Sequence, residues 1–384
     1  MQLHLKEQKM KVIAFYLPQF HEIPENNEWW GKGFTEWVNV KKAKPLYRGQ
    51  NQPRVPLQRN YYNLEDVSVQ EWQVELAKKY GVYGFCMYHY WFNGHLLLEK
   101  PVEQYLKNNK LDLPFCLCWA NENWTNVWAA GGNKILISQT YGDKNEWKKH
   151  FDYFLPFFKD KRYIKEGNCP LLVIYRPDIM DHMNEIFDFW NELAIENGFD
   201  GLVIANQYSS LEELNWNDSR IKYHIEYQPN YASRWIKGRL YNKLRNAKRK
   251  MANILGKFFK SSFFTTRIIE QHLELRDYDK YWNCILEHKP ESIKNVAGAF
   301  VDWDNTPRKG SRGSSFFNSS PEKFERYFKL LVDKVKKEYR SDYIFLFAWN
   351  EWAEGGYLEP DERNKYAYLE ALRTALIENG ENLK

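Results

Sequence analysis

Runs of apolar residues alternate along the chain with segments in which apolar residues recur every three or four positions. Eight of these runs are typical of strands buried on both faces, and they lie at residues 11–20, 82–91, 113–122, 170–177, 201–208, 222–229, 296–304 and 343–351. Helical spacing separates most of them and also follows the last, at residues 69–81, 98–109, 145–159, 182–197, 321–339 and 364–379. This alternation predicts an α/β protein with a parallel sheet that helices cover.

Eight strand–helix units favour one fold over its main alternative. A (β/α)8 TIM barrel needs eight such units, and 384 residues are enough for one barrel with insertions. A doubly wound open sheet is the alternative, but no GxGxxG or P-loop motif occurs at a strand-to-helix turn. The pattern therefore predicts a single barrel domain over residues 1–384.

The predicted strands change character at their C-terminal ends, where polar and aromatic residues replace apolar ones. In a barrel these ends meet on one face, and the loops that follow them build the active site. One polar residue at a strand end is usually a helix cap, but seven of eight ends share the change, and capping does not explain that. The predicted substrate-binding residues are Tyr16, Gln19, His89, Trp91, Trp119, Asn121, Glu122, Trp124, Tyr175, Arg176, Glu226, Asp302, Trp303, Asn350 and Trp352.

The stretch "FAWNEWAEGGYLEPD" at 347–361 holds the candidate catalytic pair, Glu351 and Glu354. Cleavage of a glycosidic bond uses two carboxyl groups, one of which protonates the leaving oxygen. Residues three apart in a straight strand point to opposite faces, so this pair requires the chain to turn after Glu351. The glycines at 355–356 supply the backbone freedom for that turn.

Other carboxylates compete for these roles. Asn-Glu occurs twice, at 121–122 and 350–351, so Glu122 with Glu351 is an alternative pair. Glu359 and Asp361 lie farther along, beside a proline, and are interpreted as structural.

The aromatic content narrows the ligand class. The chain contains 16 Trp, 26 Tyr and 24 Phe, together 17% of its residues. Part of this content serves the core, but flat apolar rings also suit the faces of pyranose sugars. This favours a carbohydrate site. No cofactor and no metal is expected, although Asp302-Trp303-Asp304 is a weak candidate for a metal-bound nucleotide diphosphate.

The cysteines and the chain ends bear on the compartment. The five cysteines are odd in number and mostly lie in predicted strands, so we expect free thiols in a reducing compartment. The first residues lack the apolar stretch of a signal peptide, and no run reaches the roughly 18–20 apolar residues of a membrane span. We therefore expect a cytoplasmic, soluble protein.

Residues 227–269 contain eleven Lys or Arg and no Asp or Glu. Within them, a basic amphipathic helix at 237–260 is expected inside an insertion, 234–275, that follows the sixth strand. Such a helix packs on the barrel or docks peripherally on the anionic inner membrane surface. Nucleic-acid binding is not expected because no readout motif accompanies the charge. A second basic segment, 308–320, is interpreted as a mobile loop over the site that could contact an acidic glycan.

Four segments carry a family resemblance, namely "FYLPQFHEIPENNEWWGKGFTEWVNV", "MYHYWF", "CWANENWT" and "AWNEWAEGGYLEPD". They resemble the WbsX-like proteins, relatives of glycoside hydrolase family 99, over about residues 11–377. The resemblance implies a (β/α)8 barrel and metal-free, retaining cleavage of α-mannosides or related sugars. It also implies that Glu351 is a base toward the sugar's own 2-hydroxyl and Glu354 the acid/base at the glycosidic oxygen.

One position departs from that pattern. Family 99 has His between the two acids, where this chain has Ala353. Three functions therefore stay open: a retaining hydrolase, a glycosyl-transferring enzyme of O-antigen, lipopolysaccharide or capsule biosynthesis, and a non-catalytic glycan-binding barrel. In each case the expected partner is an oligosaccharide or polysaccharide, which a lipid could carry.

Overall fold

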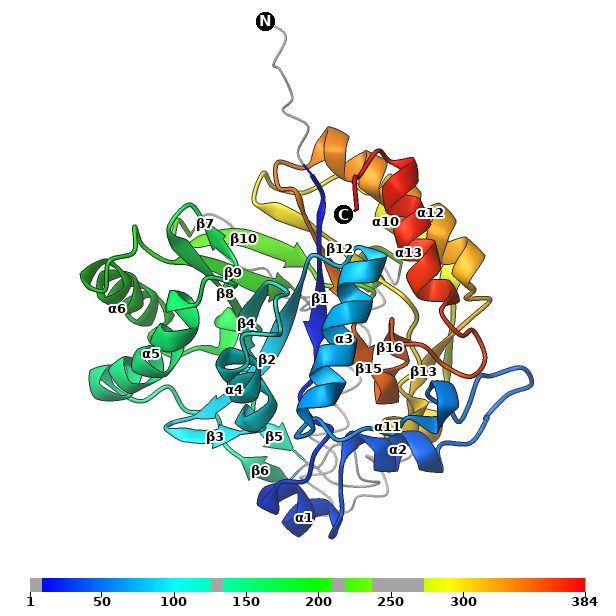
Figure 1. Ribbon diagram of the computed structural model, residues 1–384, viewed down its shortest axis with the longest axis horizontal. Helices are drawn as coiled ribbons and strands as arrows, with labels where there is room; N and C mark the ends of the chain where they lie inside the picture. The colour runs from blue at the N-terminus through cyan, green and yellow to red at the C-terminus, as the bar shows by residue number, and fades with distance from the viewer. Residues whose placement is uncertain (1–8, 126–133, 209–217, 237–272, 384) are drawn as a thin grey trace, which may run out of the picture.

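Eight parallel strands close into a barrel in the computed structural model, which describes residues 9–125, 134–208, 218–236 and 273–383 (Figure 1). Each strand pairs with the next in the chain, and the last pairs with the first. This confirms the predicted (β/α)8 barrel. The strands are β1 (Lys11–Tyr16), β2 (Gly84–Phe92), β4 (Phe115–Trp119), β8 (Cys169–Ile174), β9 (Val203–Tyr208), β10 (Ile221–Glu226), β12 (Asn295–Phe300) and β14 (Tyr343–Phe347).

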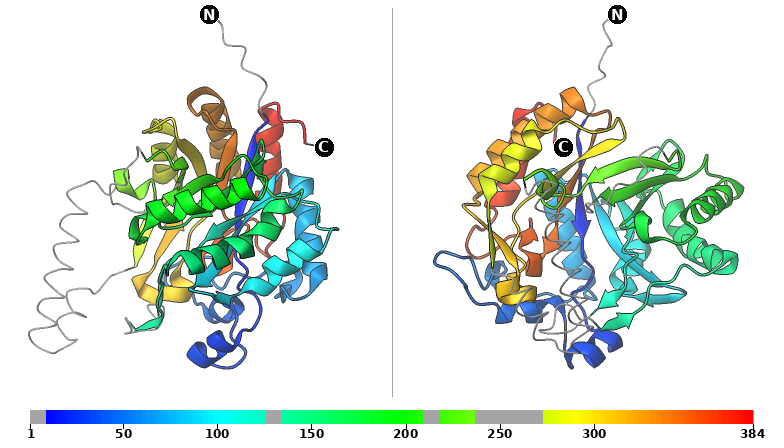
Figure 2. Two further views of the ribbon diagram at one scale, coloured as in Figure 1. Left: turned by 90° about the vertical axis from the view of Figure 1, so that its left-hand side faces the viewer. Right: turned by 180° about the vertical axis from the view of Figure 1, so that it is seen from behind.

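Helices surround the barrel, as two further views show (Figure 2). They are α3 (Val67–Tyr80), α4 (Glu99–Lys107), α5 (Lys144–Lys159), α6 (Met183–Glu196), α10 (Tyr278–Glu287), α12 (Pro321–Glu338) and α13 (Ala367–Glu378). Six of them match predicted helices to within three residues at either end. The seventh, α10, was not predicted, although its buried Tyr278, Tyr281, Trp282 and Ile285 follow helical spacing.

Side-chain caps mark where several helices begin. Asp66 accepts from the Ser68 amide at the start of α3, and Asp143 accepts from two amides at the start of α5. Ser320 does the same for α12. Each cap satisfies amides that have no partner within the helix, which fixes where the loop ends and the helix begins.

The barrel interior is filled largely by aromatic rings. Phe15 lies 5.7 Å from Tyr88 and 5.4 Å from Tyr227, measured between ring centroids, and Tyr227 lies 5.5 Å from Phe347. All four side chains are buried. The interior is therefore a packed core, and any ligand site must lie at its mouth.

Short elements in the loops build up that mouth. The loop after β1 contains α1 (Pro24–Trp30) and α2 (Glu36–Lys42), and the loop after β12 contains α11 (Thr306–Lys309) and β13 (Ser314–Phe317). β13 pairs in parallel with β11 (Glu274–Asp277), and β15 (Asn350–Glu351) pairs with β16 (Gly356–Tyr357). The two-stranded pair β5 (Trp124–Thr125) and β6 (Ile135–Ile137) follows β4.

The predicted basic insertion falls mostly outside the described residues. Its helix at 237–260 lies there entirely, while the flanking elements are α7 (Ser233–Ile236) and β11. Across the described part of the chain, no helix combines the length and the apolar character needed to cross a membrane.

Gly298 in β12 gives a stability test of the barrel. A Cβ at this position would lie 1.7 Å from the carbonyl oxygen of Glu226 in β10, and backbone cannot move aside as a side chain can. We expect Gly298→Ala to lower the free energy of unfolding by about 3 kcal/mol or more. Urea unfolding measures this, with Ala299→Gly as the control, expected to cost about 1 kcal/mol. Equal stability of Gly298→Ala and the unmodified chain would contradict the barrel packing.

Candidate active site

One guanidinium contacts three carboxylates at the mouth of the barrel, of which two are buried and that of Glu354 is partly exposed. Arg308 in α11 lies 2.7 Å from Glu354, 3.3 Å from Glu351 and 2.8 Å from Glu36. Each distance joins a guanidinium nitrogen to a carboxylate oxygen. Because Glu351 and Glu354 share this cation, they lie on the same side of the mouth, close enough to act on one sugar.

The chain turns between the two acids, as their spacing required. Glu351 ends β15, a single 3-10 turn covers Trp352–Glu354, and Gly355 adopts a left-handed conformation with φ of 69°. Glycine is needed there because a Cβ would lie 2.7 Å from the Asp304 amide nitrogen. The turn brings Glu354 back beside Glu351 instead of leaving it on the opposite face.

Burial and charge together set the proton affinity of Glu351. Burial raises its pKa, to about 8, because water no longer solvates the carboxylate. The positive charge of Arg308 opposes this increase, and the negative charges of Glu354 and Glu36 add to it. Glu351 therefore holds a proton near neutral pH.

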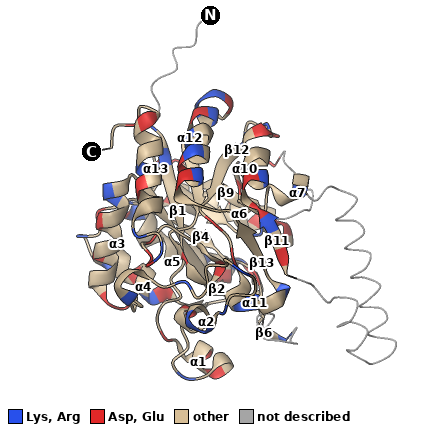
Figure 3. Cartoon of the chain, turned by 90° about the vertical axis from the view of Figure 1, so that its right-hand side faces the viewer, with Lys and Arg blue, Asp and Glu red and all other residues tan. Residues whose placement is uncertain are grey.

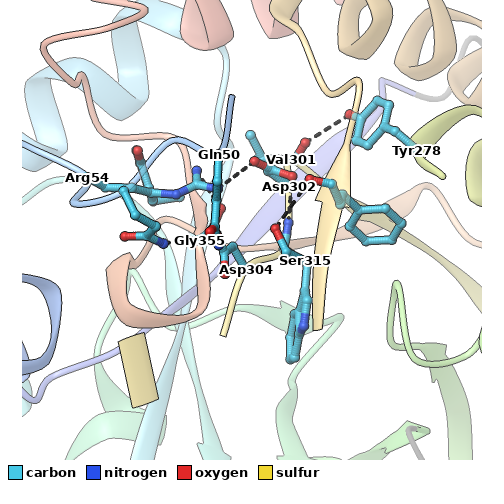
Figure 4. Close-up of polar contacts among 12 residues, drawn as sticks. Gln50, Arg54, Tyr278, Val301, Asp302, Asp304, Ser315 and Gly355 are labelled. Atoms are coloured by element: carbon cyan, nitrogen blue, oxygen red, sulfur yellow. Dashed lines mark hydrogen bonds and ion pairs between the residues drawn. The ribbon is translucent and has the colours of Figure 1, made fainter. Parts of the chain in front are cut away.

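Asp304 positions the helix that carries Arg308 (Figure 4). Its carboxylate accepts from Gln50 at 2.8 Å, from Gln52 at 3.0 Å and from both the amide and the hydroxyl of Thr306. Its own amide donates to the carbonyl of Glu354 at 2.7 Å. Asp304 thus joins α11, the turn at Glu354 and the loop after β1.

Asp302 forms a buried ion pair with Arg54 at 2.7 Å (Figure 4). Arg54 also donates to the carbonyl of Gly355 at 3.3 Å. Asp302 therefore supports the active-site turn through Arg54. Because both carboxylates of the Asp302-x-Asp304 triplet already bind protein donors, the triplet gives no support to a nucleotide-sugar site. No group of three or more metal-binding side chains occurs in the described ranges.

Tyrosines form the floor beneath the two acids. Tyr227 and Tyr88 place their hydroxyls 3.4 Å apart, and Gln207 donates to the Tyr88 hydroxyl at 3.2 Å. Burial raises the pKa of Tyr227, and the nearby Tyr175, Glu354 and Glu351 raise it further. Tyr227 therefore lies close to the carboxylate pair and keeps a neutral hydroxyl there.

An aromatic wall borders the site on the side of β2 and β4. Tyr90 is buried beside Glu351, whose charge adds to the effect of burial in raising the pKa of this tyrosine. Its ring lies 5.3 Å from that of Trp124, which in turn lies 5.6 Å from Trp29. Such rings suit the apolar face of a sugar.

Glu122, the alternative catalytic acid, belongs to a different cluster. It pairs with Arg176 at 2.7 Å, and Arg176 also makes a two-point contact with Asp178. Asn121 exchanges hydrogen bonds with the backbone of Arg176. Burial raises the pKa of Glu122, and Arg176 opposes that increase. Arg308 contacts Glu351 and Glu354 but not Glu122, so the geometry favours Glu351 with Glu354 as the catalytic pair.

Three predicted binding residues lie behind the barrel wall, toward α3. The Tyr16 hydroxyl donates to Gln73, and the Trp352 indole donates to Glu359 at 2.6 Å. Asn350 exchanges hydrogen bonds with the backbone of Leu17. These contacts account for the burial of all three, and we leave them out of the proposed substrate site.

Four more of the predicted binding residues have side chains that contact other parts of the protein and not the acids. His89, Trp91 and Trp119 pack around His150 of α5, with His89 Nε2 2.8 Å from His150 Nε2. Glu226 accepts from Asn295 and Tyr339 behind β10, and burial raises its pKa to about 7. Side chains at a strand end point alternately to the inner and the outer face of the barrel. The pattern of polar residues in the sequence does not show which of the two faces a given side chain occupies.

The last two predicted residues support the site indirectly. The Gln19 carbonyl accepts from the amide of Glu36, the first residue of α2. The Trp303 indole donates to the Ser314 hydroxyl at 3.0 Å, and its ring packs 5.2 Å from Phe347.

Sequence reasoning missed Glu36 and Arg308. Glu36 lies inside the quoted motif "GKGFTEWVNV", which was a signal that a carboxylate in this loop has a role. Arg308 lies in the basic segment 308–320, interpreted as a mobile loop over the site. Instead, α11 and β13 hold this segment, and Arg308 contacts the acids.

Comparison with known proteins identifies the family. A protein-family model described as "Glycosyltransferase WbsX" matches residues 12–372. The chain belongs to the WbsX family. Two curated relatives from Xanthomonas campestris pv. campestris, strains B100 and ATCC 33913, are 34% identical over 370 residues and are both named "Uncharacterized protein WxcX". The match covers 95% of this chain and 49% of each relative, so the chain spans about half their length.

Solved structures share the fold. The GH99 endo-alpha-mannosidase from Bacteroides thetaiotaomicron aligns with a TM-score of 0.54 at 12% identity and covers 96% of both chains. A protein titled "Glycoside hydrolase-like protein" aligns with a TM-score of 0.57 at 12% identity, covering 96% of this chain and 94% of its own. At this identity the likeness shows the fold alone.

The buried ion pair under the active-site turn can be tested by stability. Arg54→Ala leaves the Asp302 carboxylate without its cation, and we expect a loss of about 3–5 kcal/mol in the free energy of unfolding. The control is Lys78→Ala, which breaks the exposed pair with Asp112 and should change stability very little. Chemical denaturation measures both variants, and similar effects for the two would contradict the structural role of Arg54.

Proposed function

We propose that the protein is a retaining glycoside hydrolase acting on α-mannoside-like or related linkages of a bacterial polysaccharide. The observation that supports this most is the placement of Glu351 and Glu354 at the barrel mouth on one shared guanidinium. Two carboxyl groups on one side of a sugar site are what cleavage of a glycosidic bond requires. A barrel that only bound glycans would gain nothing from burying Glu36 and Glu351 next to Glu354, which costs free energy.

The proposed reaction uses the sugar's own 2-hydroxyl as nucleophile. Glu351 takes the proton of this hydroxyl as its oxygen bonds to the anomeric carbon, and Glu354 gives a proton to the leaving glycosidic oxygen. In the second step a water molecule bonds to the anomeric carbon, the bond to the 2-oxygen breaks, Glu354 takes the water proton and Glu351 returns its proton to the 2-oxygen. Two displacements retain the anomeric configuration. An intramolecular nucleophile gains a large rate advantage from its fixed position.

The raised pKa of Glu351 bears on this scheme. The reaction needs a proton on the acid and none on the base. Burial raises the pKa of Glu351 to about 8, so without substrate this group holds a proton near neutral pH. Glu351 must lose that proton before it takes the proton of the 2-hydroxyl.

Ala353 stands at the position where family 99 has His, so the polar contact to the acids has to come from another residue. It is fully buried and carries no polar group. Arg308 supplies the polar contact to the acids from a separate loop, so the missing His does not leave Glu354 without a partner.

Transfer to a sugar hydroxyl is the second candidate, favoured by the description of the family as glycosyltransferases. The chemistry differs only in the second step, where an acceptor hydroxyl replaces water. The burial of Glu351 limits water at the acids, which favours an acceptor that brings its own binding contacts. Such an enzyme would act in O-antigen or capsule assembly on a glycan that a lipid could carry.

The catalytic pair is tested by substitution. We expect Glu351→Gln and Glu354→Gln each to lower kcat by about 10²–10⁴-fold on a cleaved α-linked oligosaccharide, because each loses a proton-transfer group. Glu122→Gln should change KM more than kcat, since Glu122 lies in the neighbouring Arg176 cluster. Exposed Glu370→Gln is the control. Product analysis with and without an added acceptor sugar separates hydrolysis from transfer, and full turnover by both acid variants would refute the proposal.

The nucleophile is tested with the substrate instead of the protein. A 2-deoxy analogue of the sugar at the cleavage point lacks the hydroxyl that attacks, so we expect binding but no turnover. Competition against the normal substrate shows that the analogue binds. Turnover of the 2-deoxy sugar at a comparable rate would exclude participation of the 2-hydroxyl.

The pH profile tests the protonation of Glu351. Glu351 acts as a base only after it loses its proton, so kcat/KM should rise as pH increases through about 8. Arg308 lowers the pKa of Glu351 and Glu36 raises it. The rising limb should therefore move to higher pH in Arg308→Gln and to lower pH in Glu36→Gln. Movement of both variants in one direction would contradict this electrostatic arrangement.

A further inference from the structure

The elements β11 and β13 pair with each other, and α11 lies beside them (Figure 3). These three elements and the turn after α11 carry several basic residues. Lys309 ends α11, Arg312 lies in the turn that follows, and Arg276 comes from β11. Lys309 is close enough to Glu354 and to all three neighbouring arginines, including Arg308, for their charges to act on it. Arg308 binds the three carboxylates.

Arg276 carries an unsatisfied hydrogen-bond donor in this cluster. Its side chain is only 10% exposed, and its Nε and Nη2 donate to Glu274 at 3.1 and 3.3 Å. Its guanidinium lies 5.7 Å from the ring of Tyr281. The remaining nitrogen, Nη1, is buried and has no hydrogen-bond partner in the structure. A buried charged donor without an acceptor costs free energy, which an anion at this position would recover.

Strand pairing places Arg276 on the side of the barrel mouth. Glu274 and Arg276 pair with Ser314 and Phe316, so these four residues share one face of the two-stranded sheet. Ser314 on that face accepts from the indole of Trp303, which follows β12 at the mouth. The Arg276 guanidinium therefore belongs to the rim of the active site.

The charges around Lys309 also favour a bound anion. Burial lowers the pKa of Lys309, Glu354 opposes this, and Arg308, Arg276 and Arg312 lower it further. Several cations held together in a partly buried position repel one another, and an anion between them relieves the repulsion. Guanidinium and ammonium groups together are the usual partners of phosphate and carboxylate oxygens.

We propose that Arg276, Lys309 and Arg312 form an anion subsite next to Glu354, which binds a phosphate or carboxylate group of the glycan substrate. This inference rests on the proposed function, since it places the anion beside the bond that Glu354 protonates. A phosphate here belongs to a phosphate-linked glycan, and a carboxylate belongs to an acidic sugar. A neutral glycan leaves the Nη1 donor of Arg276 without a charged acceptor.

The test measures anion binding directly. Titrations with inorganic phosphate and, separately, with D-glucuronate are carried out at constant ionic strength in chloride, with D-glucose as the neutral comparison. Calorimetry and the fluorescence of the tryptophans near the site give the dissociation constants. We expect at least one of the two anions to bind, and Arg276→Gln and Lys309→Gln each to weaken binding by about tenfold or more, the size expected for one charged hydrogen bond.

Arg326→Gln is the matched control, because Arg326 is exposed on α12 and makes a loose ion pair with Asp279 at 3.7 Å. It should bind as the unmodified protein does. Binding of phosphate alone identifies a phosphate-bearing glycan, and binding of glucuronate alone identifies an acidic sugar. Binding of neither anion, or equal binding by Arg276→Gln, Lys309→Gln and the unmodified protein, overturns the subsite. Because Lys309 ends α11 and lies outside the buried Arg276–Glu274 contact, its variant remains informative if Arg276→Gln fails to fold.

Glu354→Gln separates this inference from the proposed function. Under the proposed function this variant loses turnover, while removal of a negative charge beside the subsite should keep or strengthen phosphate binding. An active Glu354→Gln variant refutes the proposed function and leaves the anion titrations to decide the subsite. An inactive variant together with absent anion binding refutes only the subsite.

Discussion

The site depends on the Arg308 guanidinium and the three carboxylates that it holds. Glu36, Glu351 and Glu354 lie close together with little water around them, and their mutual repulsion would drive them apart or force protons onto them. One cation in contact with all three limits that repulsion and fixes their relative positions. The cost of the burial remains visible in the raised pKa of Glu351. A group of this kind is retained for its chemistry, since buried ion clusters contribute little to net stability.

A second layer of buried polar contacts surrounds Arg308 and its three carboxylates and holds them in place. Asp304 and the Asp302–Arg54 pair join three separate loops, those after β1, β12 and β14, around the turn at Gly355. Each loop alone would be free to move, but the hydrogen bonds and the ion pair between them hold the three loops together. The barrel beneath supplies a rigid base of interlocked aromatic rings. The acids are thus placed precisely because the three loops contact one another and rest on the packed interior of the barrel.

The family match and the structural likeness constrain the function differently. Membership of the WbsX family covers nearly the whole chain, while the endo-alpha-mannosidase structure shares only the fold at 12% identity. Fold alone does not fix a reaction, and the geometry of the acids carries that argument. The chain spans about half the length of the curated relatives, so the activity of a whole protein of that kind is a proposal here.

The sequence by itself determined the barrel, the order of its strands and the location of the acids, because hydrophobic periodicity is a local signal that tertiary contacts rarely override over eight repeated units. It also indicated that Glu351 and Glu354 meet, since the two glycines after them permit a turn. It did not determine which face of each strand end a side chain occupies, so His89, Trp91 and Tyr16 were predicted at the site and lie behind the wall.

Tertiary structure alone decided the partners of the acids. Glu36 is more than 300 residues from Glu351 in the chain, and Arg308 is in a loop of its own, so no local pattern connects them. They meet because the barrel closes β14 against β1 and brings the loops after β1, β12 and β14 together. The positive charge of Arg308 and the negative charges of the carboxylates then favour one arrangement of these side chains. This preference depends on the distances between the charges and on the exclusion of water, and neither can be read from sequence spacing.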